Sequence, residues 1–302
     1  PSFSFRPSLH ANFTWCGIYP VFEIGVDVND RNAYSYNIRE DEGNPNARML
    51  FSEAENKALA NLNLKMYVPL RRNSGGVNMG MVPQLGYVTS NDAFISSSGP
   101  LSMGRLTASL RAYAVQKVAP SCVYPKLGIG LEAGYSLRPQ INDVICSNAY
   151  AYMYAYLPGI GRTHGIKFSA MLQRRLNDGI FCEPLLSILP RGFSGNDLLG
   201  KISAFPLQSR ISLDYVLPFA SVDWSWLCPV AYIRNFELTP HFDLTSFGEA
   251  GREFRNLFSA GASLCAYLGN ILWIPFPARI GESYDYNSNS THSVRFVFSV
   301  DL

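Results

Sequence analysis

Segments of about ten residues, in which every second side chain is apolar, recur along most of this chain. From Leu127 to Leu137 the apolar side chains alternate with glycine, serine and charged residues. The segments that begin at Leu62 and Leu106 follow the same rule. Strict alternation of this kind indicates β-strands with two different faces. The chain is therefore predicted to be all-β.

The second face of these segments separates two classes of β protein. A soluble sandwich buries its apolar faces against each other and turns its charged faces to water. Here the second face carries glycine and serine beside isolated charges, and only 16% of the 302 residues are charged, against roughly 25% in an average soluble domain. This pattern is typical of a transmembrane antiparallel barrel with a wet lumen and lipid against its apolar face.

The expected strands number about fourteen, which suits the even strand count of a bacterial outer-membrane barrel. Sixteen are expected if the N-terminal region holds more than the two strands His10–Trp15 and Val21–Val28. Residues 1–302 are interpreted as a single outer-membrane β-barrel domain. Because the chain starts at Pro1, with no initiator Met and no signal peptide, we expect it to be the C-terminal part of a longer protein.

Breaks in the alternation predict the connections. Glu40–Lys57 and Ser90–Pro100 are rich in small and polar residues and are predicted to be loops. Gly269–Asn270 is predicted to be the turn between two of the last strands. We expect Trp15, Trp224, Trp226 and Trp273 near the two membrane interfaces, where an amphipathic ring is favoured.

An irregular stretch, Leu176–Leu199, contains the sequence Leu-Pro-Arg-Gly-Phe. Gly192 permits a positive φ, and Arg191 offers a planar fork of donors that suits a carboxylate. The alternation of later strands turns Asp214 and Asp243 to the inside of the barrel. A loop folded into the lumen would bring Arg191 between these two carboxylates. In the alternative interpretation, the loop tip is solvated and the aspartates line a wet pore.

Three motifs carry a family resemblance. Pro190–Phe193, followed by Ile211–Tyr215 and later by His241–Asp243, resembles the C-terminal barrel of the BamA/TamA insertase and two-partner-secretion transporter superfamily. In that superfamily an Arg-Gly-Phe or Arg-Gly-Tyr loop enters the lumen and contacts acidic residues on the next two strands. This sequence has aspartate at the first acidic position, where the family usually has glutamate. The resemblance implies a lumen latch formed by Arg191, Gly192, Phe193, Asp214 and Asp243.

Four further segments are similar to the membrane barrel that ends large propeller–barrel outer-membrane proteins of Gram-negative anaerobes. They are Tyr156–Gly159, Tyr215–Pro218, Val222–Ser225 and Tyr232–Arg234. The similarity covers most of the chain from about Leu106 onward. The superfamily's periplasmic POTRA domains are not seen in this sequence, so an insertase role does not follow from the resemblance.

Other kinds of site are not indicated by the sequence. The four histidines lie on separate segments without metal-ligand spacing. No Gly-x-Ser-x-Gly elbow occurs, so we expect no enzyme, no metal and no cofactor. A formal charge of +2 with scattered Lys and Arg gives no nucleic-acid footprint.

Two functions fit these expectations. The first is an outer-membrane barrel that serves as a membrane anchor or as a subunit of a larger assembly, its lumen closed by the Arg191 loop. Its partners would be outer-membrane lipid and a periplasmic or surface protein domain, or other outer-membrane subunits. The second is a pore of the BamA/TamA type that translocates proteins or inserts them into the outer membrane.

The cysteines generate one prediction from sequence alone. Counting strands back from the C-terminus puts Cys146 and Cys182 in loops on the same extracellular side, two strands apart. A disulfide between them is therefore a candidate, although sequence does not give its geometry. If it forms, thiol titration of the unreduced, denatured protein leaves both cysteines unlabelled. Two labelled thiols at these positions would contradict the disulfide.

Overall fold

The chain is all-β and its strands pair antiparallel. The computed structural model describes residues 9–17, 19–28, 38–41, 44–50, 60–90, 93–96, 99–102, 104–118, 122–139, 146–177, 185–193, 202, 205–226, 231–249, 254–271 and 278–300. The strands are β1 (Leu9–Trp15), β2 (Val21–Val28), β3 (Ile38–Asp41), β4 (Asn44–Leu50), β5 (Ala60–Tyr67), β6 (Leu70–Ser74), β7 (Val77–Ser90), β8 (Ala93–Ser96), β9 (Gly99–Ser102), β10 (Arg105–Gln116), β11 (Gly128–Leu137), β12 (Asn148–Pro158), β13 (Gly165–Arg175), β14 (Leu207–Trp226), β15 (Ala231–Gly248), β16 (Arg255–Ile271), β17 (Ala278–Asn287) and β18 (His292–Val300).

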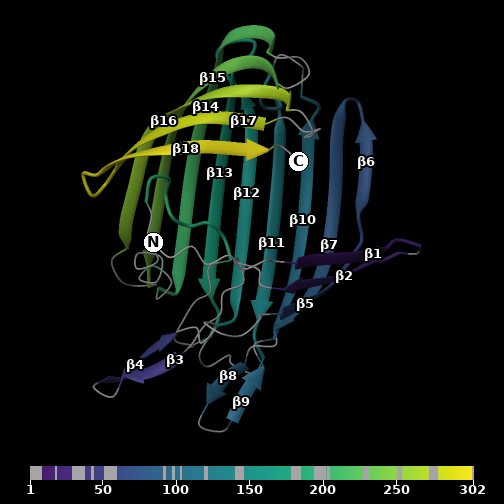
Figure 1. The fold of residues 1–302 in the computed structure, drawn as a ribbon, viewed down its shortest axis with the longest axis vertical. Helices are drawn as coiled ribbons and strands as arrows, with labels where there is room; N and C mark the ends of the chain where they lie inside the picture. Colours follow the sequence, from purple (N-terminus) through teal and green to yellow (C-terminus); the bar gives the residue numbers. More distant parts are fainter. Residues whose placement is uncertain are drawn as a thin grey trace.

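One curved sheet dominates the fold. It contains 14 strands in the order β1-β2-β5-β7-β10-β11-β12-β13-β14-β15-β16-β17-β18, with β6 beside β7. β5 and β6 pair with successive parts of β7, so they share one position in the sheet, interrupted at Val68–Pro69. In Figure 1 the sheet bends strongly, and β14–β18 arch away from the flatter wall formed by β7–β13.

The sheet is open rather than closed. Among the described residues no pairing joins β1 to β18. Strand direction gives the physical reason. Fourteen strands of which two share a position leave thirteen antiparallel positions, so β1 and β18 run in the same direction and cannot pair antiparallel. The expected antiparallel all-β sheet of about fourteen strands is confirmed, whereas the expected closure into a barrel is not met.

Three expected connections were wrong. Within the two predicted loops, β3 pairs with β4 and β8 pairs with β9, and Figure 1 shows both short hairpins at the lower end of the sheet. These four strands have only four to seven residues, and their sequences show no sustained two-residue alternation by which they could be recognised. The predicted turn at Gly269–Asn270 lies inside β16, where Asn270 pairs with Tyr232 of β15.

The register divides the sheet into two faces. Directly opposed residues share a face, so Phe168, Leu213 and Phe242 lie side by side on the outer face. Their neighbours Lys167, Asp214 and His241 lie side by side on the inner face. The alternation predicts that Phe168 and five further apolar side chains lie on this outer face. Phe168 is half-buried, and the other five are between 43% and 52% exposed: Leu110, Leu131, Leu213, Phe242 and Phe298.

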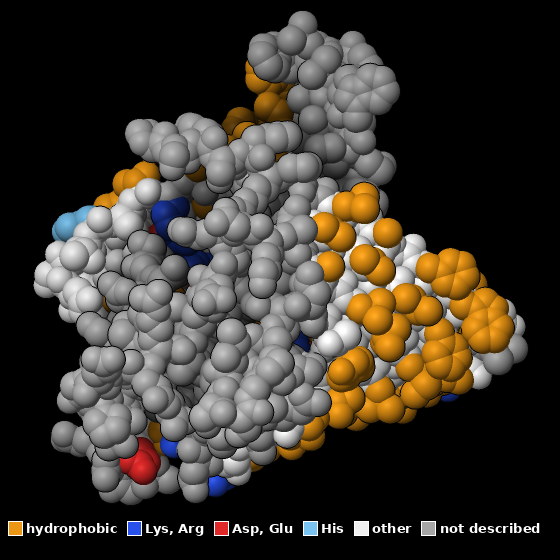
Figure 2. Space-filling model, turned by 60° about the horizontal axis from the view of Figure 1, so that its bottom comes forward, with side chains coloured by type: hydrophobic (Ala, Val, Ile, Leu, Met, Phe, Trp, Pro, Cys, Tyr) orange, Lys and Arg blue, Asp and Glu red, His pale blue; other side chains and the backbone are white. Residues whose placement is uncertain are grey.

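Polar residues are buried on the inner face while large apolar residues are exposed on the outer face. Figure 2 shows a broad hydrophobic surface on the side where β1, β2, β5 and β7 lie in Figure 1. Exposed side chains on these strands include Phe13, Trp15, Phe22, Ile24, Leu62, Leu64 and Leu85. The buried polar side chains of the inner face include Ser169, Gln173, Gln208, Ser212, Glu237, His241, Asp243, Thr245, Ser259, Ser283, Asp285 and Asn287. No helix in the described parts of the chain is long and apolar enough to cross a membrane.

Candidate functional site: a loop bound to the inner face

Residues 185–193 belong to the connection between β13 and β14 and lie against the inner face. The backbone N–H of Leu185 donates to Gln173 Oε1 of β13 at 2.9 Å. Thr245 Oγ1 of β15 donates to the carbonyl oxygen of Ile188 at 2.6 Å. These hydrogen bonds tie the loop backbone to two different strands, so the loop follows the wall of the sheet.

An apolar cluster holds the beginning of this loop. Ile188 is 1% exposed and packs with Ile202 and with Phe247 of β15. Leu186 and Leu189 of the loop pack against the same cluster. Burying an Ile side chain contributes about 1.5–3 kcal/mol, so this cluster is a substantial anchor for the loop. It lies on the inner face, where the strands are otherwise polar.

Arg191 lies between the two aspartates named from the sequence. Its Nε and Nη2 donate to Asp243 Oδ2 and Oδ1, each at 2.9 Å. Its backbone N–H donates to Asp243 Oδ2 at 2.8 Å, and Nη2 also donates to Asp214 Oδ1. The bidentate fork fixes the guanidinium in one orientation. One side chain of the loop is thereby bonded to both β14 and β15.

A second arginine completes the charge balance. Arg210 of β14 donates from Nη2 to Asp243 Oδ2 at 3.1 Å and from Nη1 to the carbonyl oxygen of Ser187 at 3.0 Å. We call Arg191, Arg210, Asp214 and Asp243 the Arg191 cluster. It contains two cations and two anions, and the Asp243 side chain is fully buried. Such a carboxylate is stable in its charged form only while its cations remain in place.

The loop arginine stays charged in this site. Burial opposes the charge on the guanidinium, but the hydrogen bonds and the charge of Asp243, together with the charge of Asp214, outweigh burial and raise the pKa of Arg191 above its ordinary value. The cluster is therefore an ion-pair network and not an acid–base site. Nothing in its chemistry resembles a proton-transfer or nucleophilic centre.

Gly192 adopts φ = +80°, which lets the chain turn directly after Arg191. A Cβ at this position would lie 2.6 Å from Cβ of Asp285 and 2.8 Å from Oγ of Ser293. Asn287 Nδ2 of β17 donates to the carbonyl oxygen of Gly192 at 2.9 Å. Glycine is thus required both for the backbone conformation and for close contact with β17 and β18.

A second buried charge group, which the sequence did not predict, lies beside the loop. His241 Nε2 of β15 lies 2.7 Å from Asp285 Oδ1 of β17, across Gly261 of the intervening β16. A Cβ on Gly261 would lie 2.9 Å from His241 Nε2, so glycine leaves the space for this contact. Arg295 of β18 donates to Asp285 Oδ2 from Nη2 at 2.8 Å. Because the turn was predicted at Gly269–Asn270, which lies inside β16, the sequence did not predict β17. The alternation of β17 turns Asp285 inward.

The remaining candidate residues have these places. Phe193 is half-buried, and its backbone N–H donates to the carbonyl oxygen of Pro190 at 3.3 Å. Trp15 is exposed at the end of β1, and Trp224 is exposed near the end of β14, whereas the side chain of Trp226 lies outside the described residues. Cys146 is buried. Trp273 and Cys182 lie outside the described residues, so the Cys146–Cys182 disulfide stays a prediction.

The part of the inner face formed by β2–β12 holds a polar cavity of about 650 Å³. Its wall includes four cations and two carboxylates: Lys65, Arg71, Arg105, Arg111, Glu23 and Glu132. Arg111 Nε lies 3.1 Å from Glu132 Oε2, and Lys65 Nζ lies 3.8 Å from Glu23 Oε2. This half of the inner face therefore carries ion pairs around open space, whereas the loop fills the other half.

The described residues contain no metal site, and comparison with known proteins gives no family for this chain. In the described part of the chain, no group of three or more His, Cys, Asp or Glu side chains is arranged to hold a metal ion. The chain matches no known protein family, and no characterised protein matches it. The resemblance stated above therefore depends on its motifs alone.

The geometry predicts that Arg191→Ala destabilises the fold. Removing the guanidinium leaves Arg210 as the one cation of the Arg191 cluster beside Asp214 and Asp243. The cost should exceed the roughly 0–1 kcal/mol of a surface pair and reach at most the about 3–5 kcal/mol of a fully broken buried ion pair. Urea unfolding followed by tryptophan fluorescence measures the difference in the free energy of unfolding. Adding Asp214→Asn to Arg191→Ala should recover part of the loss, because it removes the repulsion between the two carboxylates.

Arg162→Ala is the matched control, since Arg162 is exposed in the turn between β12 and β13. Arg162→Ala should leave the unfolding free energy within about 0.5 kcal/mol of wild type. An Arg191→Ala variant as stable as Arg162→Ala would show that the Arg191 cluster contributes nothing to holding the loop.

Proposed function

We propose that this chain is an outer-membrane β-barrel that anchors a periplasmic or surface protein domain, or joins other outer-membrane subunits, with its lumen closed by the Arg191 loop. The observation that carries the proposal is the distribution of side chains: exposed apolar rows on the outer face and buried polar rows on the inner face. In water the outer face would be a large apolar surface without cover. Against lipid it is the stabilising face.

The backbone supports the same proposal. Each strand position between β1 and β18 hydrogen-bonds to both of its neighbours, as a membrane requires because lipid offers no partner for a free N–H or C=O group, and only the outer edges of β1 and β18 lack a partner among the described residues. Strands β10–β13 have ten to twelve residues, which suits a tilted membrane-spanning strand of about 9–11 residues. Closing the barrel requires an odd number of further strands between β1 and β18, because these two run in the same direction.

The loop supports closure of the lumen. It is bonded to β13, β14, β15 and β17 by the hydrogen bonds of Gln173, Asp214, Asp243 and Asn287. A segment held at so many points blocks the space that it occupies. A membrane anchor needs a stable barrel without an open passage. A loop fixed inside the lumen would close that passage.

The second candidate is a protein-translocating or protein-inserting pore of the BamA/TamA type. The polar cavity of about 650 Å³ beside β2–β12 favours it, because the loop leaves that half of the inner face open. The Arg-Gly-Phe motif with its two aspartates also resembles that superfamily. In this candidate, release of the Arg191 cluster would widen the cavity into a passage.

Membrane insertion is tested by placing charge on each face of one strand. Leu85→Arg, and Leu213→Arg as a second case, replace an exposed apolar side chain of the outer face by a charged one. Against lipid this charge costs about 2–4 kcal/mol near the bilayer midplane. Gln84→Arg is the matched control, since Gln84 is the neighbouring residue of β7 and lines the polar cavity. Folding into phospholipid vesicles, followed by protection from protease, should fail for the outer variants only. Equal assembly of all three variants would refute the membrane proposal.

Conductance in planar bilayers separates the anchor from the pore. A plugged anchor should give no steady current, and Arg191→Ala should increase the frequency of brief openings because the loop loses its bonds to two strands. Large, frequent openings in the wild-type protein would instead support the pore. Silence in both proteins, after insertion is verified, would show that the Arg191 cluster does not control the opening.

A further inference from the structure

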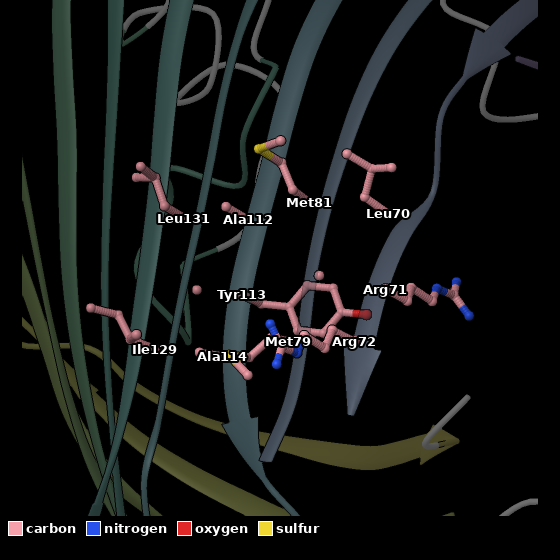
Figure 3. A pocket seen from close by; sticks show the side chains of 12 residues that line it. Leu70, Arg71, Arg72, Met79, Met81, Ala112, Tyr113, Ala114, Ile129 and Leu131 are labelled. Atoms are coloured by element: carbon pink, nitrogen blue, oxygen red, sulfur yellow. The ribbon is translucent and has the colours of Figure 1, made fainter. Parts of the chain in front are cut away.

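A groove of about 540 Å³ runs along the outer face over β10. Figure 3 shows two rows of side chains around it. The register places Leu70, Met81, Ala112 and Leu131 in the first row and Arg72, Met79, Ala114 and Ile129 in the second. The groove follows from residue size, because the strand in the middle carries alanine where both neighbours carry long side chains.

The floor and walls have the shape of a slot. Ala112 and Ala114 form the floor, Met79 and Met81 of β7 form one wall, and β11 supplies the other wall. The two walls are two strand spacings apart, about 9–10 Å. The lining is almost entirely apolar, and the methionines can adapt their shape to a flexible chain. A long, narrow apolar ligand fits such a slot.

Charge at one end of the slot narrows the ligand class. Arg72 lines the groove at its β6 edge and is exposed. None of the ion pairs among the described residues includes Arg72, so its charge is available. The next outer position of β10 toward the same end is Gln116, paired with Val77. The outer face thus changes from apolar to cationic and polar within about 15 Å along β10, at a rise of roughly 3.3 Å per residue.

We propose that this groove binds one acyl chain of an anionic glycerophospholipid, with the lipid phosphate beside Arg72. This inference rests on the proposed membrane location. Arginine binds phosphate oxygens through a planar fork of donors. The two parts of the ligand match the two parts of the site: a hydrocarbon chain over Ala112 and Ala114, and an anionic headgroup at the edge strand.

The position of the groove along the sheet agrees with a headgroup at Arg72. The groove lies toward the end where the two-residue turn Gly75–Gly76 joins β6 to β7. The exposed Trp224 lies near the end of β14, which runs toward the same end of the sheet as β10, and tryptophan favours the headgroup region. Short turns face the periplasm in bacterial barrels, so the ligand is a phospholipid of the periplasmic leaflet.

Native mass spectrometry of the protein in detergent micelles tests the proposal with two added lipids, phosphatidylglycerol and phosphatidylcholine of the same chain length. The wild-type protein should bind one phosphatidylglycerol more tightly than phosphatidylcholine. Arg72→Gln should weaken phosphatidylglycerol binding about tenfold, the loss expected for one charge-assisted hydrogen bond, and leave phosphatidylcholine unchanged. Ala112→Leu should fill the floor and weaken binding of both lipids.

Two controls keep the result specific. Ala170→Leu enlarges an outer-face residue of β13 away from the groove, and Arg162→Gln removes a cation from the turn that follows β12. Both should bind like the wild type. A retained lipid preference in Arg72→Gln, or equal weakening by Ala170→Leu and Ala112→Leu, would overturn the proposal. Because binding is measured in micelles and insertion in vesicles, a groove that fails this test leaves the insertion result standing.

Discussion

The bonds between Arg191 and Asp243 are the interaction on which the filled half of the inner face depends. Asp243 is fully buried on β15, and a buried carboxylate without a cation is too costly to keep charged. Arg191 supplies that cation from a loop, and Arg210 supplies a second one from β14. The aspartate requires the loop, and the loop is oriented by the aspartate. Packing of Ile188 on Phe247 then fixes the loop at a point away from the charges.

Glycine makes these contacts across strands possible. Gly192 brings the loop backbone against β17 and β18, and Gly261 lets His241 reach Asp285 over an intervening strand. In each case a methyl group would lie within 3 Å of a polar side-chain atom. On the inner face, these glycines therefore leave the space in which groups from other strands form hydrogen bonds. This explains why glycine, serine and isolated charges occur together on one face of the strands.

The sequence was informative wherever the two-residue period was long. It predicted the two faces of the sheet, and it singled out Arg191, Asp214 and Asp243, which the structure brings together. It could not predict the short hairpins at β3–β4 and β8–β9, nor the continuation of β16 through Gly269–Asn270, because a Gly-Asn pair commonly marks a turn. Because of that misplaced turn, β17 was not predicted, and the second charge group around Asp285 was not identified from the sequence. Whether an antiparallel sheet can close depends on whether its number of strand positions is odd or even, and the predicted number of about fourteen did not fix this.

The two halves of the inner face suit different tasks. Around the Arg191 cluster, buried ions are paired over several strands, and opening that half would expose a carboxylate with no replacement for its cations. Around Arg111 and Glu132, the ion pairs border open space and are partly exposed, so water can replace either partner at small cost. In the proposed barrel, the loop bound by the Arg191 cluster would stay in place, and any rearrangement would begin on the β2–β12 side. The anchor and pore candidates differ only in whether that side ever opens far enough to release the loop.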